Sequence, residues 1–146
     1  MKKRWPIITM SMVVLMVVVG VAALPAIKRH AQAVACSNQM HSILLVASML
    51  WPDDHDGRLP SDFLSMSNEL STTKILICPA DRERHASANW SSLSADHCSY
   101  EIVTPGLRKT DTNTVFLRCR VHGYTGYADD RLLDASGRLV KPQRLW

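Results

Sequence analysis

The sequence lacks the short motifs that mark two common kinds of enzyme active site. It contains no Gly-x-Ser-x-Gly nucleophile elbow and no Cys-x-x-Cys redox pair. An acidic cluster does occur at Asp53, Asp54, His55 and Asp56. Because Pro and Gly flank it, it favours a solvated helix end over an acid/base site. We therefore expect a protein that is not an enzyme and that needs no cofactor.

Charge is missing from a long apolar run near the start of the chain. The 23 residues from Trp5 to Ile27 carry none. As a helix rising about 1.5 Å per residue they span roughly 35 Å, which covers the ~30 Å hydrocarbon core of a bilayer. The apolar part of a cleaved signal peptide is shorter, at about 7–15 residues. We predict that residues 1–27 are a permanent transmembrane anchor.

The net charge of +4 does not indicate a nucleic-acid partner. Five cations flank the apolar run: Lys2, Lys3, Arg4, Lys28 and Arg29. Without these five, 12 of the 17 Lys and Arg remain against all 13 acidic residues. No basic stripe is left for phosphate contacts. The excess of cations before the run favours a cytoplasmic N-terminus and a periplasmic head.

Cysteine is scarce, and all four copies follow the apolar run. They are Cys36, Cys78, Cys98 and Cys119, an even number without close pairs. This pattern suits disulfides in an oxidising compartment, and the alternative is buried free thiols in a cytoplasmic domain. Four cysteines allow three pairings, and the sequence does not choose among them.

Zinc ligation is the other chemistry that these residue types suggest. Cys119 and His122 are three residues apart, and His97 is next to Cys98. Four such ligands can close a tetrahedral site. However, adjacent residues on a strand point to opposite faces, so His97 and Cys98 are poor partners at one ion. We therefore expect no metal.

A narrow apolar stripe follows the anchor, at spacings of 3, 4, 3, 4 and 3 residues. Its members are Ala33, Cys36, Met40, Ile43, Ala47 and Leu50. That period indicates a helix with one packed face. We predict that residues 28–51 continue the membrane helix as an amphipathic segment, with Pro25 as a joint that loosens or bends it.

The remaining residues, 52–146, predict a small α+β head. Alternation and turn residues predict a short helix over Asp62–Leu70 and strands over Lys74–Cys78, Cys98–Val103 and Thr114–Val121. They also predict a polar loop with a short helix over 81–97, with Trp90 as an aromatic plug, and a hairpin turn over Asp134–Gly137. The expected fold class is α+β: a long N-terminal helix, half transmembrane and half amphipathic, packed on a small antiparallel sheet.

The order of several short motifs resembles the type IV pilin-like proteins, in particular the pseudopilins of type II secretion. These motifs are LPAIKRHAQAVACSNQMHSILL, DDHDGRLP, CPADRER, CSYE and CRVHGYTGYADD. The resemblance implies a non-enzymatic assembly protein of the bacterial inner membrane. It would cross the membrane once and pack by its helix in a pilus-like or secretion-like assembly. Its partners would be membrane lipid, other pilin-like subunits and inner-membrane components of the secretion or pilus machinery.

The chain departs from this family at its start. No glycine precedes Gly20, Ile8 stands where the family has a glutamate, and no acidic residue precedes Asp53. The features that a prepilin peptidase reads are therefore missing, and we expect an uncleaved relative. The alternative function is a bitopic envelope protein whose periplasmic head binds a ligand or partner without any filament.

The resemblance also bears on the cysteines and on the acidic turn. It favours Cys78 with Cys119 as a disulfide, ahead of Cys36 and Cys98, because these two lie beside the family's Cys-Pro and Cys-x-x-His-Gly elements. One such bridge would stabilise the head by about 2–4 kcal/mol. The family's Asp-Gly motif is Asp129-Asp130 here, which we interpret as a turn because calcium needs six to eight oxygen ligands.

Overall fold

The computed structural model describes the backbone of residues 5–142 and the side chains of residues 10–142. The basic residues 2–4 and the last four residues of the predicted head lie outside that range. The chain forms two compact units, Met1–Ala31 and Gln32–Trp146. The boundary between them falls a few residues after the predicted end of the anchor at residue 27.

The first unit is helical from Trp5 onward. Helix α1 covers Trp5–Leu45 and contains Pro25, so the proline does not end the helix. Arg29 Nε donates a hydrogen bond to the carbonyl oxygen of Pro25, one turn back, at 3.2 Å. The large apolar side chains from Met10 to Ile27 lie on every face of the helix and are 57–69% exposed. This segment is long and apolar enough to cross a membrane.

From Gln32 onward, α1 belongs to the second unit and buries one face. Cys36, Met40, Ile43, Leu44 and Ala47 are completely buried. The helix then widens into a π-helical turn at Val46–Leu50 and tightens into a 3₁₀ turn at Trp51–Asp54.

Because of the π-helical turn, one member of the predicted apolar stripe, Leu50, does not lie on the packed face. Leu50 is 58% exposed, whereas Ala33 is half-buried and the other four members are buried. A π-helical turn contains more residues than an α-helical turn. It therefore rotates Leu50 away from the packed face.

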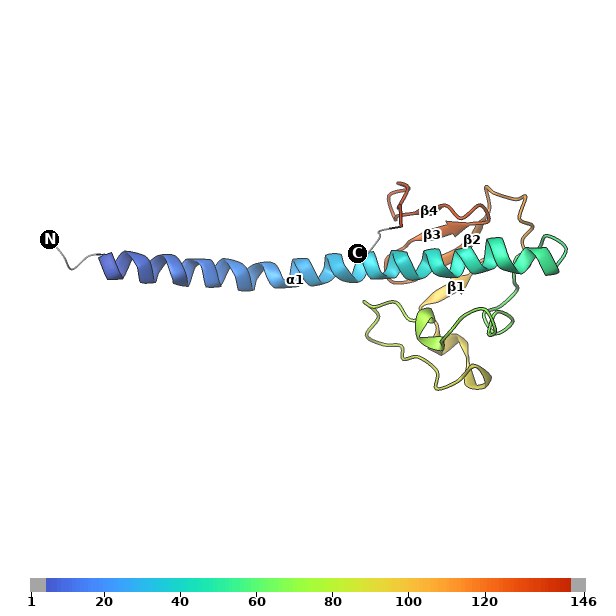
Figure 1. Ribbon diagram of the computed structural model, residues 1–146, viewed down its shortest axis with the longest axis horizontal. Helices are drawn as coiled ribbons and strands as arrows, with labels where there is room; N and C mark the ends of the chain where they lie inside the picture. Colours follow the sequence, from blue (N-terminus) through green and yellow to red (C-terminus); the bar gives the residue numbers. More distant parts are fainter. Residues whose placement is uncertain (1–4, 143–146) are drawn as a thin grey trace. The chain divides into compact units, whose positions relative to one another are not determined.

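Four short antiparallel strands form the sheet, in the order β1-β2-β3-β4 (Figure 1). Their bounds are β1 Tyr100–Ile102, β2 Val115–Cys119, β3 Thr125–Tyr127 and β4 Leu132–Leu133. Tyr100 pairs with Cys119, and Gly126 pairs with Leu132. A register shift in β2 places both Phe116 and Leu117 in the core. The predicted α+β class, a long helix packed on a small antiparallel sheet, is confirmed.

Two predicted elements of the head are wrong. Lys74–Cys78 is not a strand, because Thr73–Leu76 forms a 3₁₀ turn that is capped by the side chain of Thr72. Asp62–Leu70 is a series of turns and not a helix. There Asp62 Oδ1 accepts the backbone N–H of Ser65 at 2.8 Å. Such local side-chain bonds compete with regular helix formation.

The polar loop over 81–97 and the hairpin turn over Asp134–Gly137 are both present in the head. Within 81–97 the structure has 3₁₀ turns at Trp90–Ser92 and Ala95–His97, and Trp90 is half-buried against the core. The hairpin turn is present, since Asp134 N–H donates to Arg138 O at 2.9 Å. Strand β3 was not predicted: its three residues, Thr-Gly-Tyr, are too few to show an alternating pattern.

Candidate functional site

Three cysteines and one histidine converge in the core of the head. They are Cys36, Cys78, Cys119 and His122, and their sulfur atoms and imidazole nitrogen all lie within 4.8 Å of one another. The three cysteines are fully buried, and His122 is half-buried. Cys36 Sγ lies 3.5 Å from Cys119 Sγ, and Cys78 Sγ lies 3.2 Å from His122 Nδ1. Such a set can hold a metal ion.

Two members of the cluster come from the turn that joins β2 to β3. Cys119 is the last residue of β2, and Gly123 N–H donates to its carbonyl oxygen at 3.0 Å, which closes the turn. His122 N–H donates to Cys119 Sγ at 3.4 Å. Gly123 follows with a φ of +69°, in the left-handed region that glycine adopts without strain. This Cys-x-x-His-Gly turn therefore aims a thiol and an imidazole at the same point.

The loop that carries Cys78 is held from both sides. Asp81 N–H donates to the carbonyl oxygen of Cys78 at 2.9 Å, which turns the chain sharply after Cys78-Pro79. From the helix, Gln32 Nε2 donates to the carbonyl oxygen of Pro79 at 2.9 Å. Ala80 N–H also donates to the thiol of Cys78. These bonds fix the sulfur in the cluster.

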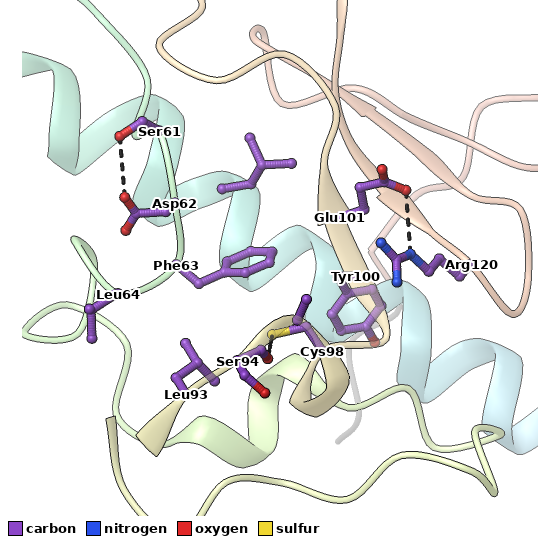
Figure 2. A pocket seen from close by; sticks show the side chains of 12 residues that line it. Ser61, Asp62, Phe63, Leu64, Leu93, Ser94, Cys98, Tyr100, Glu101 and Arg120 are labelled. Carbon is purple, nitrogen blue, oxygen red and sulfur yellow. Dashed lines mark hydrogen bonds and ion pairs between the residues drawn. The ribbon is translucent and has the colours of Figure 1, made fainter. Parts of the chain in front are cut away.

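Helix α1 contributes Cys36, and Tyr100 in β1 lies beside it. Tyr100 Oη is 3.5 Å from Cys36 Sγ and donates to Gln39 Oε1 at 2.8 Å. Burial raises the pKa of Tyr100 well above its ordinary value, so the hydroxyl keeps its proton and stays a donor. Figure 2 shows the Tyr100 ring, which also lines a neighbouring pocket.

The thiols of the cluster are not equivalent. Hydrogen bonds from Cys36 and then Cys78 lower the pKa of Cys119, and the backbone N–H groups of His122 and Val121 act in the same direction. The hydrogen bond to Cys119 raises the pKa of Cys36, because Cys36 would lose that bond with its proton, and burial raises it further. Cys119 Sγ also accepts the backbone N–H of His122 at 3.4 Å, which favours its thiolate, the form that binds metals and reacts as a nucleophile.

The structure groups these residues differently from the sequence argument on zinc. The sequence offers Cys119 and His122 together with His97 and Cys98 as zinc ligands. His97 Nδ1 instead lies 2.8 Å from Ser94 Oγ, and Cys98 Sγ donates to Ser94 O at 3.5 Å, both away from the cluster. Their places are taken by Cys36 and Cys78, whose approach the sequence does not indicate. Only the Cys-x-x-His spacing of Cys119 and His122 could be recognised in the sequence as a possible part of this cluster.

The two cysteines that the resemblance pairs, Cys78 and Cys119, do lie together, but as thiols. All four cysteines lie in the described part of the chain, and all four are free. Cys98 is also buried, and burial raises its pKa.

A second polar centre lies next to the cluster and links two of the quoted motifs. Asp81, from CPADRER, accepts Ser99 Oγ, from CSYE, at 2.7 Å and the Arg84 guanidinium at 3.2 Å. Burial alone would raise the pKa of Asp81. These bonds and two backbone N–H groups lower it to about 2. Asp81 is thus a buried, fully paired carboxylate that supports the loop carrying Cys78.

A pocket of about 400 Å³ lies between residues 61–64, residues 93–95 and strand β1 (Figure 2). The Phe63 ring, Leu93 and Ile102 provide its apolar lining. At one rim Arg120 Nε donates to Glu101 Oε2 at 3.4 Å. The pocket therefore combines an apolar wall with an exposed ion pair.

The acidic turns do not form compact carboxylate sites. Asp53, Asp54 and Asp56 are exposed at the end of the 3₁₀ turn, where His55 stacks on Trp51 with ring centroids 3.6 Å apart. In the other turn, Asp129 pairs with Arg131 at 2.6 Å, and Asp130 has a φ of +70°. Both segments are turns, in agreement with the interpretation from sequence.

No protein-family model, no curated protein and no solved structure matches this chain. The fold and the site alone therefore define its class. It is an α+β protein with a helix of membrane-spanning length and a small head that carries a buried cysteine–histidine cluster.

Proposed function

We propose that this protein is a non-enzymatic, membrane-anchored structural subunit of a pseudopilin-like kind. Its helix crosses the bacterial inner membrane once, with the N-terminus in the cytoplasm and the head in the periplasm. In the membrane it packs against other pilin-like subunits of a pilus-like or type II secretion-like assembly. The motif order described above and the confirmed α+β layout support this proposal.

The observation that carries the proposal is the uniform apolar surface of α1 from Met10 to Ile27. Its large apolar side chains are 57–69% exposed on all faces of the helix. A helix that is apolar all round is stable only inside a protein core or a membrane. We therefore take lipid and neighbouring helices as the natural surroundings of this segment.

The two parts of α1 have different contacts available. Between Gln32 and Ala47 the buried face packs on the head's own sheet, so that face is already occupied. The membrane part remains open on all sides, and Ala22 and Ala26 form a small-xxx-small pair there. Pairs of small residues let helices in a membrane approach closely. Subunit contacts are therefore assigned to the membrane part.

A photo-crosslinking experiment tests this assignment. The full chain is produced with a set of pseudopilin subunits, with a benzophenone amino acid at Val14 in the membrane part. The control carries the same group at Leu139 in the head. Leu139 is 56% exposed and Val14 is 57% exposed, so the two positions are equally accessible. We expect crosslinks to pilin-like subunits from Val14 and none from Leu139. Monomers alone at both positions would contradict the assembly role.

The pocket between Phe63 and Arg120 favours one alternative, a bitopic protein whose periplasmic head binds a ligand. Its volume of about 400 Å³ suits a small amphipathic molecule with an acidic or basic end that could meet Arg120 or Glu101. Mass spectrometry of the membrane-extracted protein would detect a retained ligand. A Leu93→Trp variant, which fills the pocket, should lose such a ligand without losing the Val14 crosslinks.

A further inference from the structure

We propose that Cys36, Cys78, Cys119 and His122 bind one structural zinc ion through three thiolates and one imidazole. This site is separate from the membrane function and does not depend on it. The four residues come from the helix, the Cys-Pro loop and the turn after β2, so the ion would join all three segments of the head.

The spacing of the ligand atoms fits a tetrahedral ion. With Zn–S of about 2.3 Å and Zn–N of about 2.0–2.1 Å, tetrahedral ligand atoms lie roughly 3.5–3.8 Å apart. The separation between Cys36 Sγ and Cys119 Sγ is 3.5 Å, and that between Cys78 Sγ and His122 Nδ1 is 3.2 Å. All the separations fall within 4.8 Å. Only small shifts would complete the geometry.

The surroundings stabilise thiolates, the form of cysteine that binds zinc. Cys119 Sγ accepts the N–H of His122 at 3.4 Å. Tyr100 Oη, which donates to Gln39 Oε1 at 2.8 Å, lies 3.5 Å from Cys36 Sγ. Hydrogen bonds of this kind orient the ligands of a metal and adjust its affinity. The imidazole of His122 is itself held by stacking on Tyr124, with ring centroids 5.4 Å apart.

Zinc accounts for all four residues, whereas a disulfide does not. A bond between any two of the cysteines would leave the third, buried thiol and the half-buried imidazole without a role. A tetrahedral set of sulfur and nitrogen ligands is typical of zinc. Four protein ligands leave no position for water or substrate, so the site is structural and not catalytic. Cys36 and Cys119 lie 83 residues apart in sequence, so the ion would close a long loop.

The test uses the full chain in detergent, purified without reductant or chelator. Elemental analysis and native mass spectrometry should find one zinc per chain. Replacement of the metal by Co²⁺ should give the intense visible absorption of a tetrahedral site together with thiolate-to-cobalt charge-transfer bands.

Two matched cysteine variants distinguish the loss of a zinc ligand from the general effect of replacing a buried cysteine. Cys119→Ser should lose zinc at least tenfold, whereas Cys98→Ser should keep one ion per chain, because Cys98 is also buried, at 6% exposure, but lies outside the cluster. His122→Cys preserves four ligands and should still bind Co²⁺, with stronger charge-transfer bands because a fourth thiolate replaces the imidazole. This variant keeps the test decisive if Cys119→Ser does not fold.

Three results would overturn the proposal. The first is a disulfide within the cluster in the purified wild-type chain. The second is the absence of zinc together with no tetrahedral cobalt spectrum after reduction. The third is equal loss of metal from Cys98→Ser and Cys119→Ser, which would place the ion elsewhere.

Discussion

Leu44 in α1 occupies the space that a Cβ atom at Gly126 in β3 would need. An ideal Cβ built on Gly126 lies 2.6 Å from Leu44 Cδ1 and 2.9 Å from Cδ2. Leu44 is completely buried, so its side chain has little room to move away. The helix and the sheet therefore approach one another at a point where only glycine fits.

Gly126→Ala should destabilise the head by about 1–3 kcal/mol, the usual cost of overpacking a core. Denaturant unfolding of the full chain in detergent, followed by circular dichroism, measures the change. Leu44→Ala alone should also destabilise, by about 2–5 kcal/mol, because it leaves a cavity. In the double variant the two costs should be less than additive, since the smaller Leu44→Ala side chain makes room for the new methyl group. Strict additivity would contradict the close contact.

Asp130→Gly should stabilise the protein. The φ of Asp130 is +70°, a conformation that costs a non-glycine residue about 1–2 kcal/mol. In addition, Asp130 Oδ1 is buried and has no hydrogen-bond partner among the described residues, and burial raises the pKa of this carboxyl. Thermal unfolding should show a higher Tm for Asp130→Gly. The neighbouring Asp129→Gly should not raise it, because that change removes the ion pair with Arg131.

The turn from Asp134 to Arg138 should lose its order in acid. Hydrogen bonds from Ser136 Oγ and then from Arg138 N–H lower the pKa of Asp134 from 3.8 to about 2. Because the folded pKa is the lower one, the turn is fully supported above about pH 4 and loses that support as the pH falls through about 2. The amide shifts of Ser136 and Arg138, followed by NMR, should titrate near that lower value. An Asp134→Asn variant should show no such titration, and a wild-type midpoint near 3.8 would contradict the bonds.

A charge in the middle of the apolar segment should block membrane insertion. Val17→Asp should cost about 2.5–3.5 kcal/mol of insertion free energy, the usual value for an acidic residue near the centre of a membrane helix. Extraction of membranes at alkaline pH should release the variant and not the wild type. Leu139→Asp provides the control, since Leu139 is 56% exposed against 59% for Val17. Equal release of both variants would show that the segment does not span the membrane.

The features that depend on local patterns could be predicted. The uncharged run up to Ile27 and the 3-4 spacing of Cys36, Met40, Ile43 and Ala47 describe one helix, whose period is visible in any window of the chain. The strand at Val115–Cys119 and the turn at Asp134–Gly137 also rest on neighbouring residues. Short apolar runs were misleading, because KILIC fits a buried strand as well as a 3₁₀ turn.

Sequence by itself thus determined the long helix, its membrane-spanning length and apolarity, and the α+β class. The tertiary structure decided which cysteines meet. Cys36 reaches Cys119 from 83 residues away because the helix packs on the sheet at the end of β2. Cys78 reaches His122 from 44 residues away because its loop lies against the turn after β2. Contacts over such distances depend on how elements pack and not on local spacing. For this reason the cysteine–histidine cluster became visible only in the folded chain.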